Sequence, residues 1–334
     1  MIDLLSISRE ELYKLPFAKQ RYRYDQLFSW LHQHQVFNLD DMVNLPKDFR
    51  EVLSQETFVP DLLVLQTLQS DDGTKKLLFK LDQDLVEGVL LSYKHGNTMC
   101  LSTQVGCAMG CTFCASGLDG LIRNLSASEM LRMFYEGARL SENLNHLVLM
   151  GSGEPLDNYD EVMTLLRMLH DEAGMNLSYR NMTLSTCGIV PKIYALAEEG
   201  IPINLAISLH APNDEIRRQS MPVARAYKMD DILPAATDYQ RITGRQVTLE
   251  YALIKGLNDQ EEHAIELRNR IRGKGFLVNL IPLNPVEEND YEATSMDRAK
   301  RFMSELEEDK IYVTIRRENG ADILASCGQL RNQT

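Results

Sequence analysis

The sequence has no long hydrophobic run. No stretch approaches the ~18 uninterrupted apolar residues that a membrane-spanning helix needs, which excludes a membrane span. The first residues, MIDLLSISREELYKL, carry charges too early and too often for a secretory signal peptide. Low-complexity tracts and short-period repeats are also lacking. We therefore expect a soluble, cytoplasmic protein with no membrane partner.

Positive charge is also scarce. The chain has 35 Lys and Arg against 48 Asp and Glu, a net charge of −13 and a pI near 5.1. Nonspecific nucleic-acid binding needs clustered Lys and Arg, so the composition counts against it. The deficit is uneven, since residues 1–60 hold seven Lys and Arg against nine Asp and Glu. Arginine pairs could still supply a local basic surface, namely Arg21 with Arg23, Arg217 with Arg218, and Arg316 with Arg317.

Length and apolar content indicate a folded protein of more than one part. The chain has 334 residues and is 44% hydrophobic, enough for a full core, which excludes global disorder. This length suits one large domain, or one large and one small. We expect an N-terminal helical domain over 1–57, a β-strand extension over 58–95 and the main domain over 96–334.

Strands and helices alternate through the main domain. Strand-like runs lie at 98–105, 146–151, 181–188, 203–210, 246–254, 276–283 and 311–317. Amphipathic segments between them include 126–140, 159–171, 259–273 and a final helix at about 294–309. Six β-α units predict a parallel sheet with right-handed crossovers. Periodicity leaves open whether that sheet is flat or curls into a partial barrel.

Four of the six cysteines fall within fifteen residues, and three of them form C-x3-C-x2-C after the first strand: Cys107, Cys111 and Cys114. In a reducing compartment such a cluster indicates metal or redox chemistry. Three thiolates on one loop can hold three irons of a cubane cluster and leave the fourth iron open for a ligand. The alternative is a zinc site with Cys100 as fourth ligand, although no second C-x2-C pair is present.

The cysteine motif, with Phe113 before its last cysteine, resembles the signature of radical S-adenosylmethionine (SAM) enzymes. The runs MCLSTQVGCAMGCTFCASGLDGLIRNLSASE, MGSGEPLDN, TLSTCGIVP, ISLHAPND, LNP and RRENGADILASCGQL resemble the RlmN/Cfr family of radical SAM RNA (adenine) methyltransferases. The runs DLLSISREEL, RYRYDQLFSWL and DMVNLPKDFRE look more like RlmN. The likeness covers nearly the whole chain. It implies an α/β fold, a partial (β/α)6 radical SAM barrel with a small helical domain and a short β extension.

The resemblance also implies the cofactor site. Cys107, Cys111 and Cys114 would ligate a [4Fe-4S] cluster whose open iron chelates SAM. The residues that would contact or line the SAM site are Gly153, Glu154, Ser185, Ser208, Leu209, His210 and Asn284. These segments follow predicted strand ends, where α/β folds place ligands. The residue before Gly153 differs from the family pattern: this chain has Ser152 where RlmN usually has Met.

Three further residues match the family's catalytic groups. Cys327, in ASCGQL, would be methylated first and then deliver the carbon. Cys100 would resolve the covalent adduct, leaving a transient disulfide, and Glu87 would accept the ring proton. An electron-poor adenine carbon is a poor partner for direct methyl transfer, whereas a thiolate takes a methyl group readily. Cys187 has no counterpart in the family, and core packing is its expected role.

The resemblance implies the reaction and its partners. The enzyme would use two SAM per turnover to methylate C2 of an adenosine in 23S rRNA, at the peptidyl-transferase centre, and in tRNA, 3′ of the anticodon. A flavodoxin-type reductant and a monomeric state are expected. The alternatives are Cfr-type C8 methylation with antibiotic resistance, a radical SAM activase of another protein, and a zinc-binding RNA adaptor. Arg21 and Arg23 are candidate RNA contacts of the N-terminal domain, and Arg316 and Arg317 are further candidates.

Overall fold

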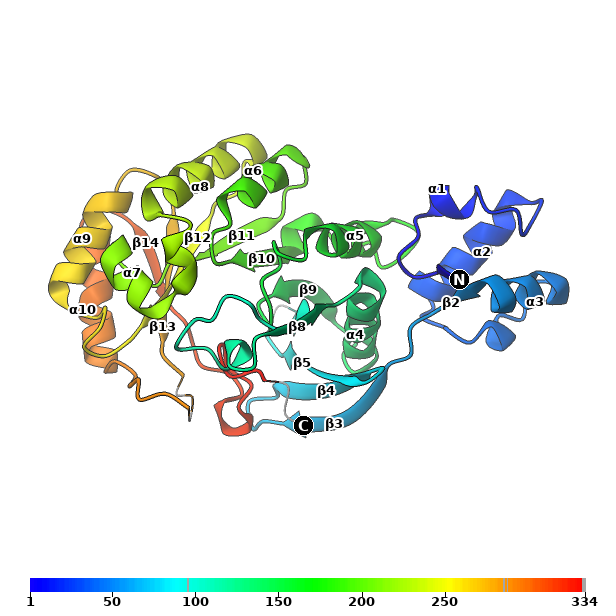
Figure 1. Ribbon diagram of the computed structural model, residues 1–334, viewed down its shortest axis with the longest axis horizontal. Coiled ribbons are helices and arrows are strands. Elements are labelled where there is room, and N and C mark those ends of the chain that lie inside the picture. Colours follow the sequence, from blue (N-terminus) through cyan, green and yellow to red (C-terminus); the bar gives the residue numbers. More distant parts are fainter. Residues whose placement is uncertain (95, 285, 287, 332–334) are drawn as a thin grey trace.

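A ten-stranded curved sheet forms the centre of the molecule in the computed structural model, which describes residues 1–94, 96–284, 286 and 288–331. The strand order from edge to edge is β14-β13-β12-β11-β10-β9-β6-β5-β4-β3. Helices lie along the outer side of the sheet, and a group of short helices lies at the end remote from β14 (Figure 1). None of the described helices is long and apolar enough to cross a membrane.

The N-terminal region is helical, as predicted. Its helices are α1 (Arg9–Leu12), α2 (Arg21–His32) and α3 (Lys47–Glu56). The buried side chains of α2 recur at helical spacing and include Tyr24, Leu27, Phe28 and Leu31. A short parallel pair, β1 (Ile2–Asp3) with β2 (Thr57–Phe58), joins the two ends of this region. Strands of two residues carry no periodic signal, so the sequence did not predict this pair.

Antiparallel strands form the β extension. They are β3 (Leu63–Gln69), β4 (Lys75–Leu81) and β5 (Asp84–Leu91). β5 pairs antiparallel with β6 (Asn97–Cys100), and β6 pairs parallel with β9. The extension therefore continues the main sheet rather than forming a sheet of its own.

The parallel part of the sheet follows the predicted alternation. Its strands after β6 are β9 (Leu144–Leu149), β10 (Met182–Thr186), β11 (Asn204–Ser208), β12 (Thr248–Leu253), β13 (Leu277–Pro282) and β14 (Tyr312–Ile315). The connecting helices are α4 (Ala127–Arg139), α5 (Tyr159–His170), α6 (Val190–Glu198), α7 (Asp214–Ser220), α8 (Met229–Thr243), α9 (Glu261–Ile271) and α10 (Met296–Glu307). Because β3 and β14 are the two edges, the barrel is partial and open, as the family resemblance implied.

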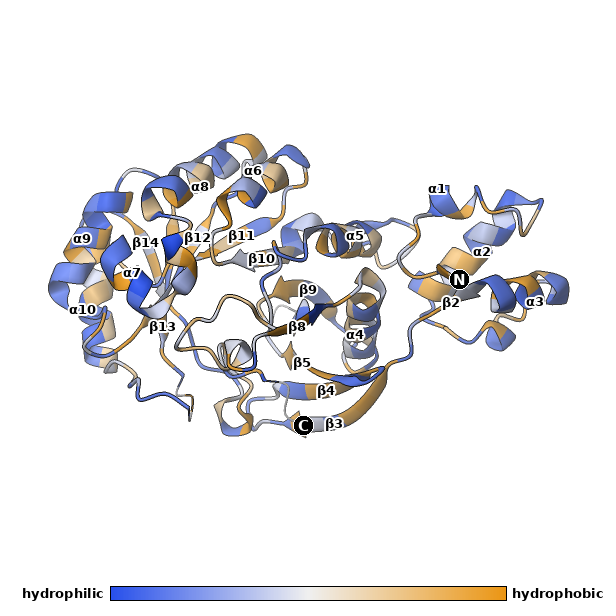
Figure 2. Cartoon of the chain, in the orientation of Figure 1, coloured by the Kyte–Doolittle hydropathy of each residue, from blue (hydrophilic) through white to orange (hydrophobic). Residues whose placement is uncertain are grey.

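The core lies between the sheet and these helices. Strands such as β3 and β5 are mainly apolar, whereas the helices alternate between hydrophobic and hydrophilic positions (Figure 2). On α4, for example, Met130, Leu131 and Phe134 are fully buried. The longer helices therefore pack an apolar side on the sheet, and the concave side of the sheet stays free for a site.

The predicted strand 98–105 is two separate strands, which corrects the sequence-based prediction. Its first half is β6, and its second half is β7 (Gln104–Gly106), which pairs with β8 (Leu121–Asn124) in a two-stranded sheet. The cysteine loop connects β7 to β8. The sequence pattern does not reveal this break, because the turn between β6 and β7 is as buried as the strands beside it.

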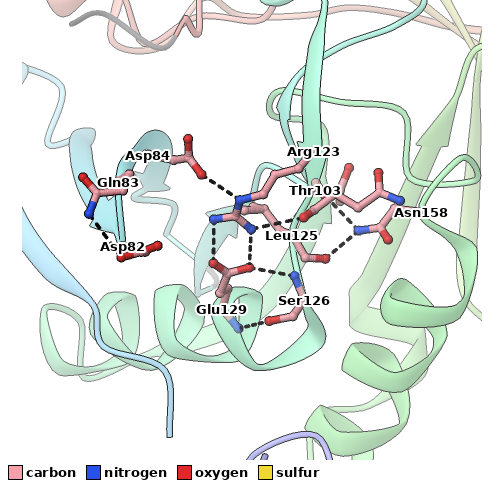
Figure 3. Close-up of polar contacts among 10 residues, drawn as sticks. Asp82, Gln83, Asp84, Thr103, Arg123, Leu125, Ser126, Glu129 and Asn158 are labelled. Carbon is pink, nitrogen blue, oxygen red and sulfur yellow. Dashed lines mark hydrogen bonds and ion pairs between the residues drawn. The ribbon is translucent and has the colours of Figure 1, made fainter.

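Thr103 fixes that turn. Its backbone N–H donates to the Ser152 carbonyl at 2.8 Å. Its own carbonyl accepts the Leu125 N–H at 3.1 Å and the Asn158 side-chain amide at 2.9 Å (Figure 3). The chain leaves the main sheet here because the loop after β9 offers it other hydrogen-bond partners.

Arg123 ties the β7–β8 hairpin to the rest of the fold. Its guanidinium donates to Asp84, at the start of β5, at 2.6 Å and to both oxygens of Glu129 at 2.8 and 2.9 Å (Figure 3). Glu129 also accepts the Ser126 N–H in the capping box of α4. The strand that leads out of the cysteine loop is therefore held by charged contacts to β5 and α4.

Candidate active site

Glycine is required where the cysteine loop begins. Gly106 has φ +79°, and a Cβ added there would lie 1.9 Å from the Gly120 carbonyl oxygen. The Cys107 N–H donates to that same oxygen at 2.9 Å. The two ends of the loop therefore meet so closely that no other residue fits, and this closure holds the three cysteines on one short loop.

The cysteine loop faces a cavity of about 170 Å³ at the carboxyl ends of the parallel strands. The expected site residues that line it are Cys107, Cys111, Cys114, Gly153, Glu154, Ser185, Ser208, His210, Asn284 and Cys327. They come from the cysteine loop, from the ends of β9, β10, β11 and β13, and from the C-terminal segment. Segments far apart in the chain thus meet at one site, as α/β folds predict.

The three loop thiols supply sulfur donors to this cavity. Burial raises the pKa of Cys107 to about 11 and raises the pKa of Cys111 and Cys114 as well. A buried thiol with a raised pKa gives up its proton when a metal coordinates its sulfur. Three thiols on one cavity wall fit the donor set of an iron–sulfur cluster. For a single metal ion, by contrast, no group of three or more His, Cys, Asp or Glu in the described part of the chain is suitably placed.

Glu154 presents a fixed carboxylate to the cavity. Its side chain is 3% exposed and accepts the N–H groups of Cys187 at 2.7 Å and Leu156 at 3.0 Å. Burial raises the pKa of Glu154, although both hydrogen bonds oppose that rise. A cationic ligand group would offset the cost of this buried charge, so the carboxylate suits an ammonium group.

His210 is a neutral acceptor in this site. Its Nδ1 accepts the Ala252 N–H at 2.9 Å, and its ring packs edge-on against Phe113 at 5.0 Å between centroids. Burial lowers the pKa of His210 to about 3, so the ring carries no charge near neutral pH. The N–H of His210 is therefore at Nε2, on the side of the ring away from Ala252.

Leu209 is buried in the core and does not line the cavity. Its N–H donates to the Glu250 carbonyl at 3.0 Å, and its carbonyl accepts from Arg217 Nε at 3.2 Å. Of the three neighbouring residues expected at the SAM site, only Ser208 and His210 reach the cavity.

The Arg217–Arg218 pair suggests a local basic surface, and for Arg217 this prediction is wrong. The side chain is 0% exposed. Its guanidinium donates to the carbonyls of Leu209, Tyr227, Cys187 and Ser208 at 2.6 to 3.3 Å. Arg217 therefore holds together the loops after β10 and β11 beneath the cavity. A run of two arginines gave no sign of this, because only the fold brings four carbonyls around one of them.

Arg217→Met is expected to destabilise the protein by at least about 3 kcal/mol, because it leaves several buried carbonyls without a donor. Urea unfolding followed by circular dichroism would measure the loss. The control is Arg218→Met, since Arg218 is exposed, and its effect should stay within about 0.5 kcal/mol. Equal unfolding midpoints for the two variants would contradict the structural role.

A second cavity, of about 610 Å³, lies on the other side of Cys327. Residues that line both cavities are Ile281, Asn284, Arg316 and Cys327. The Asn284 side-chain amide donates to the Cys327 carbonyl at 2.8 Å, which places the C-terminal segment between the two cavities. Cys100, at the end of β6, lines the second cavity only. The structure thus puts the two expected catalytic cysteines around one space.

Both of these cysteines are free thiols. Burial raises the pKa of Cys100 to about 12, with a further contribution from Cys327. Cys100 is therefore held as a neutral thiol and needs a change in its surroundings before it attacks another sulfur.

Glu87 lies on β5 beneath the C-terminal segment. Its carboxylate contacts Lys76 Nζ at 2.7 Å and accepts the Arg331 N–H at 2.8 Å. Burial raises the pKa of Glu87, while Lys76 acts in the opposite direction. Glu87 lines neither of the two cavities. Val89, two residues along the strand and on the same face, lines the second one.

Sequence reasoning assigned no role at the site to Glu250, and it considered Arg316 only as an RNA contact. Glu250, on β12, is 6% exposed, lines the first cavity and accepts from the Asn279 side chain at 2.8 Å. Cys327 and Glu250 raise the pKa of Arg316 above its usual range. A carboxylate inside the apolar run QVTLEYALI was the available signal for Glu250.

Comparisons with known proteins identify relatives of this chain. A family model described as the radical SAM superfamily matches residues 101–268. Another, described as the ribosomal RNA large subunit methyltransferase N-terminal domain, matches residues 2–59. The crystal structure of a radical SAM methyltransferase from Sphaerobacter thermophilus is similar over the full length of both chains, with a TM-score of 0.95 and 41% identity. Streptococcus suis SuiB bound to S-adenosylmethionine shares the fold at TM-score 0.50 and 14% identity, over 64% of this chain and 49% of that one.

Curated relatives extend over nearly the whole chain. A protein of Alkaliphilus oremlandii named probable dual-specificity RNA methyltransferase RlmN is 48% identical over 337 residues, which cover 99% of this chain and 98% of that one. A protein of Bacillus cytotoxicus with the same name is 49% identical over 319 residues, covering 94% and 88%. The chain therefore belongs to the RlmN family of radical SAM RNA methyltransferases, enzymes that use a [4Fe-4S] cluster and S-adenosylmethionine.

Proposed function

We propose that this enzyme methylates C2 of adenosine in 23S rRNA and in tRNA through an S-methylcysteine at Cys327. The observation that carries the proposal is the position of Cys327 in the wall between two cavities, one lined by the loop thiols and the other by Cys100. A carrier that takes a methyl group on one side and delivers a carbon on the other needs this position.

The first cavity would hold the cofactors. Cys107, Cys111 and Cys114 would bind the cluster, and Glu154 with Gly153 would bind the SAM ammonium group. Gly153 lines the cavity with φ +103°, and a Cβ there would lie 2.7 Å from the side chain of Gln104, so no residue with a side chain fits at this position. The polar groups that would line the rest of SAM belong to Ser185, Ser208, His210 and Asn284.

When bound, the cluster and two SAM molecules per turnover would supply a methyl group for Cys327 and a 5′-deoxyadenosyl radical that removes hydrogen from it. Cys327 Sγ then joins protein and RNA through one carbon. Glu87 takes the proton from the ring carbon while the radical adduct would return one electron to the oxidised cluster, and Cys100 Sγ then attacks Cys327 Sγ. That attack breaks the sulfur–carbon bond, and the released carbon takes up the proton from the Cys100 thiol to become the methyl group. The resulting disulfide needs reduction before the next turnover.

Glu87 is covered in this structure by the backbone of Arg331. For Glu87 to reach an RNA base, the C-terminal segment that carries Cys327 has to shift. Among the described residues this segment contacts the sheet through a small apolar cluster, which includes Val89, Leu91, Ala325 and Leu330. Hydrogen bonds also hold it, since the Ala115 N–H donates to the Gly328 carbonyl at 2.8 Å and the Ser116 hydroxyl to the Leu330 carbonyl at 2.7 Å. A shift of the segment therefore has to break these bonds as well as the Arg331 contact.

The test is anaerobic. The reconstituted enzyme receives SAM, a reductant and an unmodified 23S rRNA fragment, and nucleoside mass spectrometry then identifies the product. We expect 2-methyladenosine, and the same product when tRNA replaces the fragment. 8-Methyladenosine would show Cfr-type chemistry instead. SAM cleavage without either product would favour an activase of another protein.

The N-terminal helices are the proposed RNA-contacting region. Arg21 lies over the Tyr13 ring at 4.1 Å, and Arg23 lies over the Tyr22 ring at 4.7 Å and donates to the Asn44 carbonyl at 3.0 Å. Arginines beside aromatic rings are a common surface for RNA. None of these contacts neutralises the two positive charges.

Replacing Arg21 and Arg23 together by Ala should raise the RNA KM by about tenfold or more, because two charge-assisted contacts are lost. Methylation of Cys327 without RNA should keep its rate, since the first cavity is untouched. Arg241→Ala/Arg301→Ala provides the charge-matched control on α8 and α10. An unaltered KM would remove Arg21 and Arg23 from the interface.

The remaining partners follow from this reaction. We propose a flavodoxin-type reductant, a monomeric enzyme and a cytoplasmic location, because ribosomes and tRNA are there. Sedimentation of the reconstituted enzyme at micromolar concentration would test the monomeric state.

A further inference from the structure

The second cavity has a basic rim, which is unusual in a chain with a net charge of −13. Its charged lining residues are Lys300, Arg316, Arg317 and Glu318. Three positive groups therefore face one negative group. The deeper wall is apolar and includes Val89, Leu91 and Ile281. An apolar wall with a cationic rim suits a ligand that has a flat apolar part and an anionic part.

Lys300 and Arg317 come from different elements and converge on this rim. Lys300 lies on α10, one turn after Met296, which lines the same cavity. Arg317 lies just after the end of β14. Both side chains are exposed at the cavity opening, whereas Arg316 lies deeper and also lines the first cavity.

Neither side chain has a hydrogen bond or an ion pair with any residue that the structure describes. The contrast is clear on the same helix, where Arg298 donates to Gln260 at 2.7 Å and lies 3.8 Å from Asp259. Several other surface arginines, including Arg139, Arg167 and Arg270, are paired in the same way. Lys300 and Arg317 keep their full charge available for a ligand at the cavity opening.

We propose that Lys300 and Arg317 form a phosphate-binding site for the RNA phosphodiester that flanks the target adenosine. This inference rests on the proposed function, because the adenine would occupy the cavity between Cys100 and Cys327. Its volume of about 610 Å³ lies within the usual range for sites that enclose small ligands. A nucleotide pulled out of its stack brings its own phosphates to the opening, and two unpaired cations there would hold them.

The pair also explains how an acidic enzyme holds RNA at the point of reaction. Phosphate contacts set the register of the strand without reading its sequence, while the pocket selects the base. Lys300 and Arg317 would therefore act as positioning residues, and the reacting sulfur atoms would remain those of Cys327 and Cys100.

The first test is the double variant Lys300→Ala/Arg317→Ala. The RNA KM should rise by about tenfold or more, and the slope of log affinity against log salt should become shallower by about 1.4, the value for two single-strand phosphate contacts. The control is Arg241→Ala/Arg301→Ala, which removes the same number of positive charges. Arg301 follows Lys300 on α10 but lines a different cavity, together with Asp259 and the start of α9. Lys300→Arg/Arg317→Lys should restore most of the slope.

The second test changes the RNA. A fragment with a neutral methylphosphonate at the linkage beside the target adenosine should bind the wild-type enzyme more weakly than the natural fragment. The double variant should bind both fragments equally. Full sensitivity of the double variant to the methylphosphonate, or a salt slope equal to that of the control, would overturn the phosphate site.

These outcomes are separable from failure of the proposed function. Equilibrium binding of RNA reports the phosphate site even if no methyladenosine forms. Conversely, a wild-type enzyme that binds RNA with the expected salt slope but makes no 2-methyladenosine would refute the reaction and leave the phosphate site standing.

Discussion

Cys100→Ala is expected to leave the enzyme covalently joined to its RNA. The variant keeps Cys327 and the whole first cavity, so methyl transfer to Cys327 and addition to the ring proceed. Without the second thiol, nothing breaks the sulfur–carbon bond that links protein and RNA. We expect less than one turnover per enzyme and a protein band that shifts on denaturing gels and returns after ribonuclease treatment.

The matching control is Cys100→Ala/Cys327→Ala, which lacks the carrier and should form no adduct. Cys100 is 7% exposed and packs beside Val89, so the loss of one sulfur atom should cost about 1 kcal/mol or less of stability. Thermal melting of each variant checks that the fold persists. Multiple turnovers by Cys100→Ala would show that another group resolves the adduct.

Glu87→Gln should lower the turnover rate by about 10²- to 10⁴-fold, the usual contribution of a positioned general base. The adduct should accumulate with its ring proton in place. Because Gln keeps the shape of the side chain and can accept the Arg331 N–H, the RNA KM should change little. A turnover rate within twofold of the wild-type rate would exclude Glu87 as the base.

The pKa of Glu87 gives this prediction a pH signature. Burial raises that pKa above 4.5, and Lys76 opposes the rise. The base works only when ionised, so activity should fall as the pH drops through the raised pKa. Lys76→Met removes the opposing cation, raises the pKa further and should move the acid limb of the kcat profile to higher pH. If the acid limb of the Lys76→Met profile stays at the wild-type pH, a group other than Glu87 determines it.

Local sequence was enough to predict the cofactor loop. Cys107, Cys111 and Cys114 lie within eight residues, so their spacing alone brings three thiols onto one loop. The alternation of strands and helices from β6 to β14 was likewise visible as periodicity. Both signals depend only on near neighbours in the chain, and in parallel sheets the strand ends then bring Glu154, Ser185 and Ser208 together.

Family resemblance supplied residues that periodicity could not. Cys100 and Cys327 lie in distant segments, and neither has a local pattern that marks a catalytic thiol. Their proposed roles came from matched motifs, and the structure places both at one cavity. The proposed role of Glu87 also came from a matched motif, but Glu87 lines neither cavity, and Lys76 and the C-terminal backbone cover its carboxylate.

The sequence by itself determined the family, the order of strands and helices and the donor set of the cofactor loop, because these depend on residue types at short spacing. Tertiary structure decided the rest. It turned Arg217 inward to hold four carbonyls, split 98–105 into two strands and left Lys300 and Arg317 unpaired at one opening. Burial and ion pairing depend on which distant segments meet, and no local pattern records that.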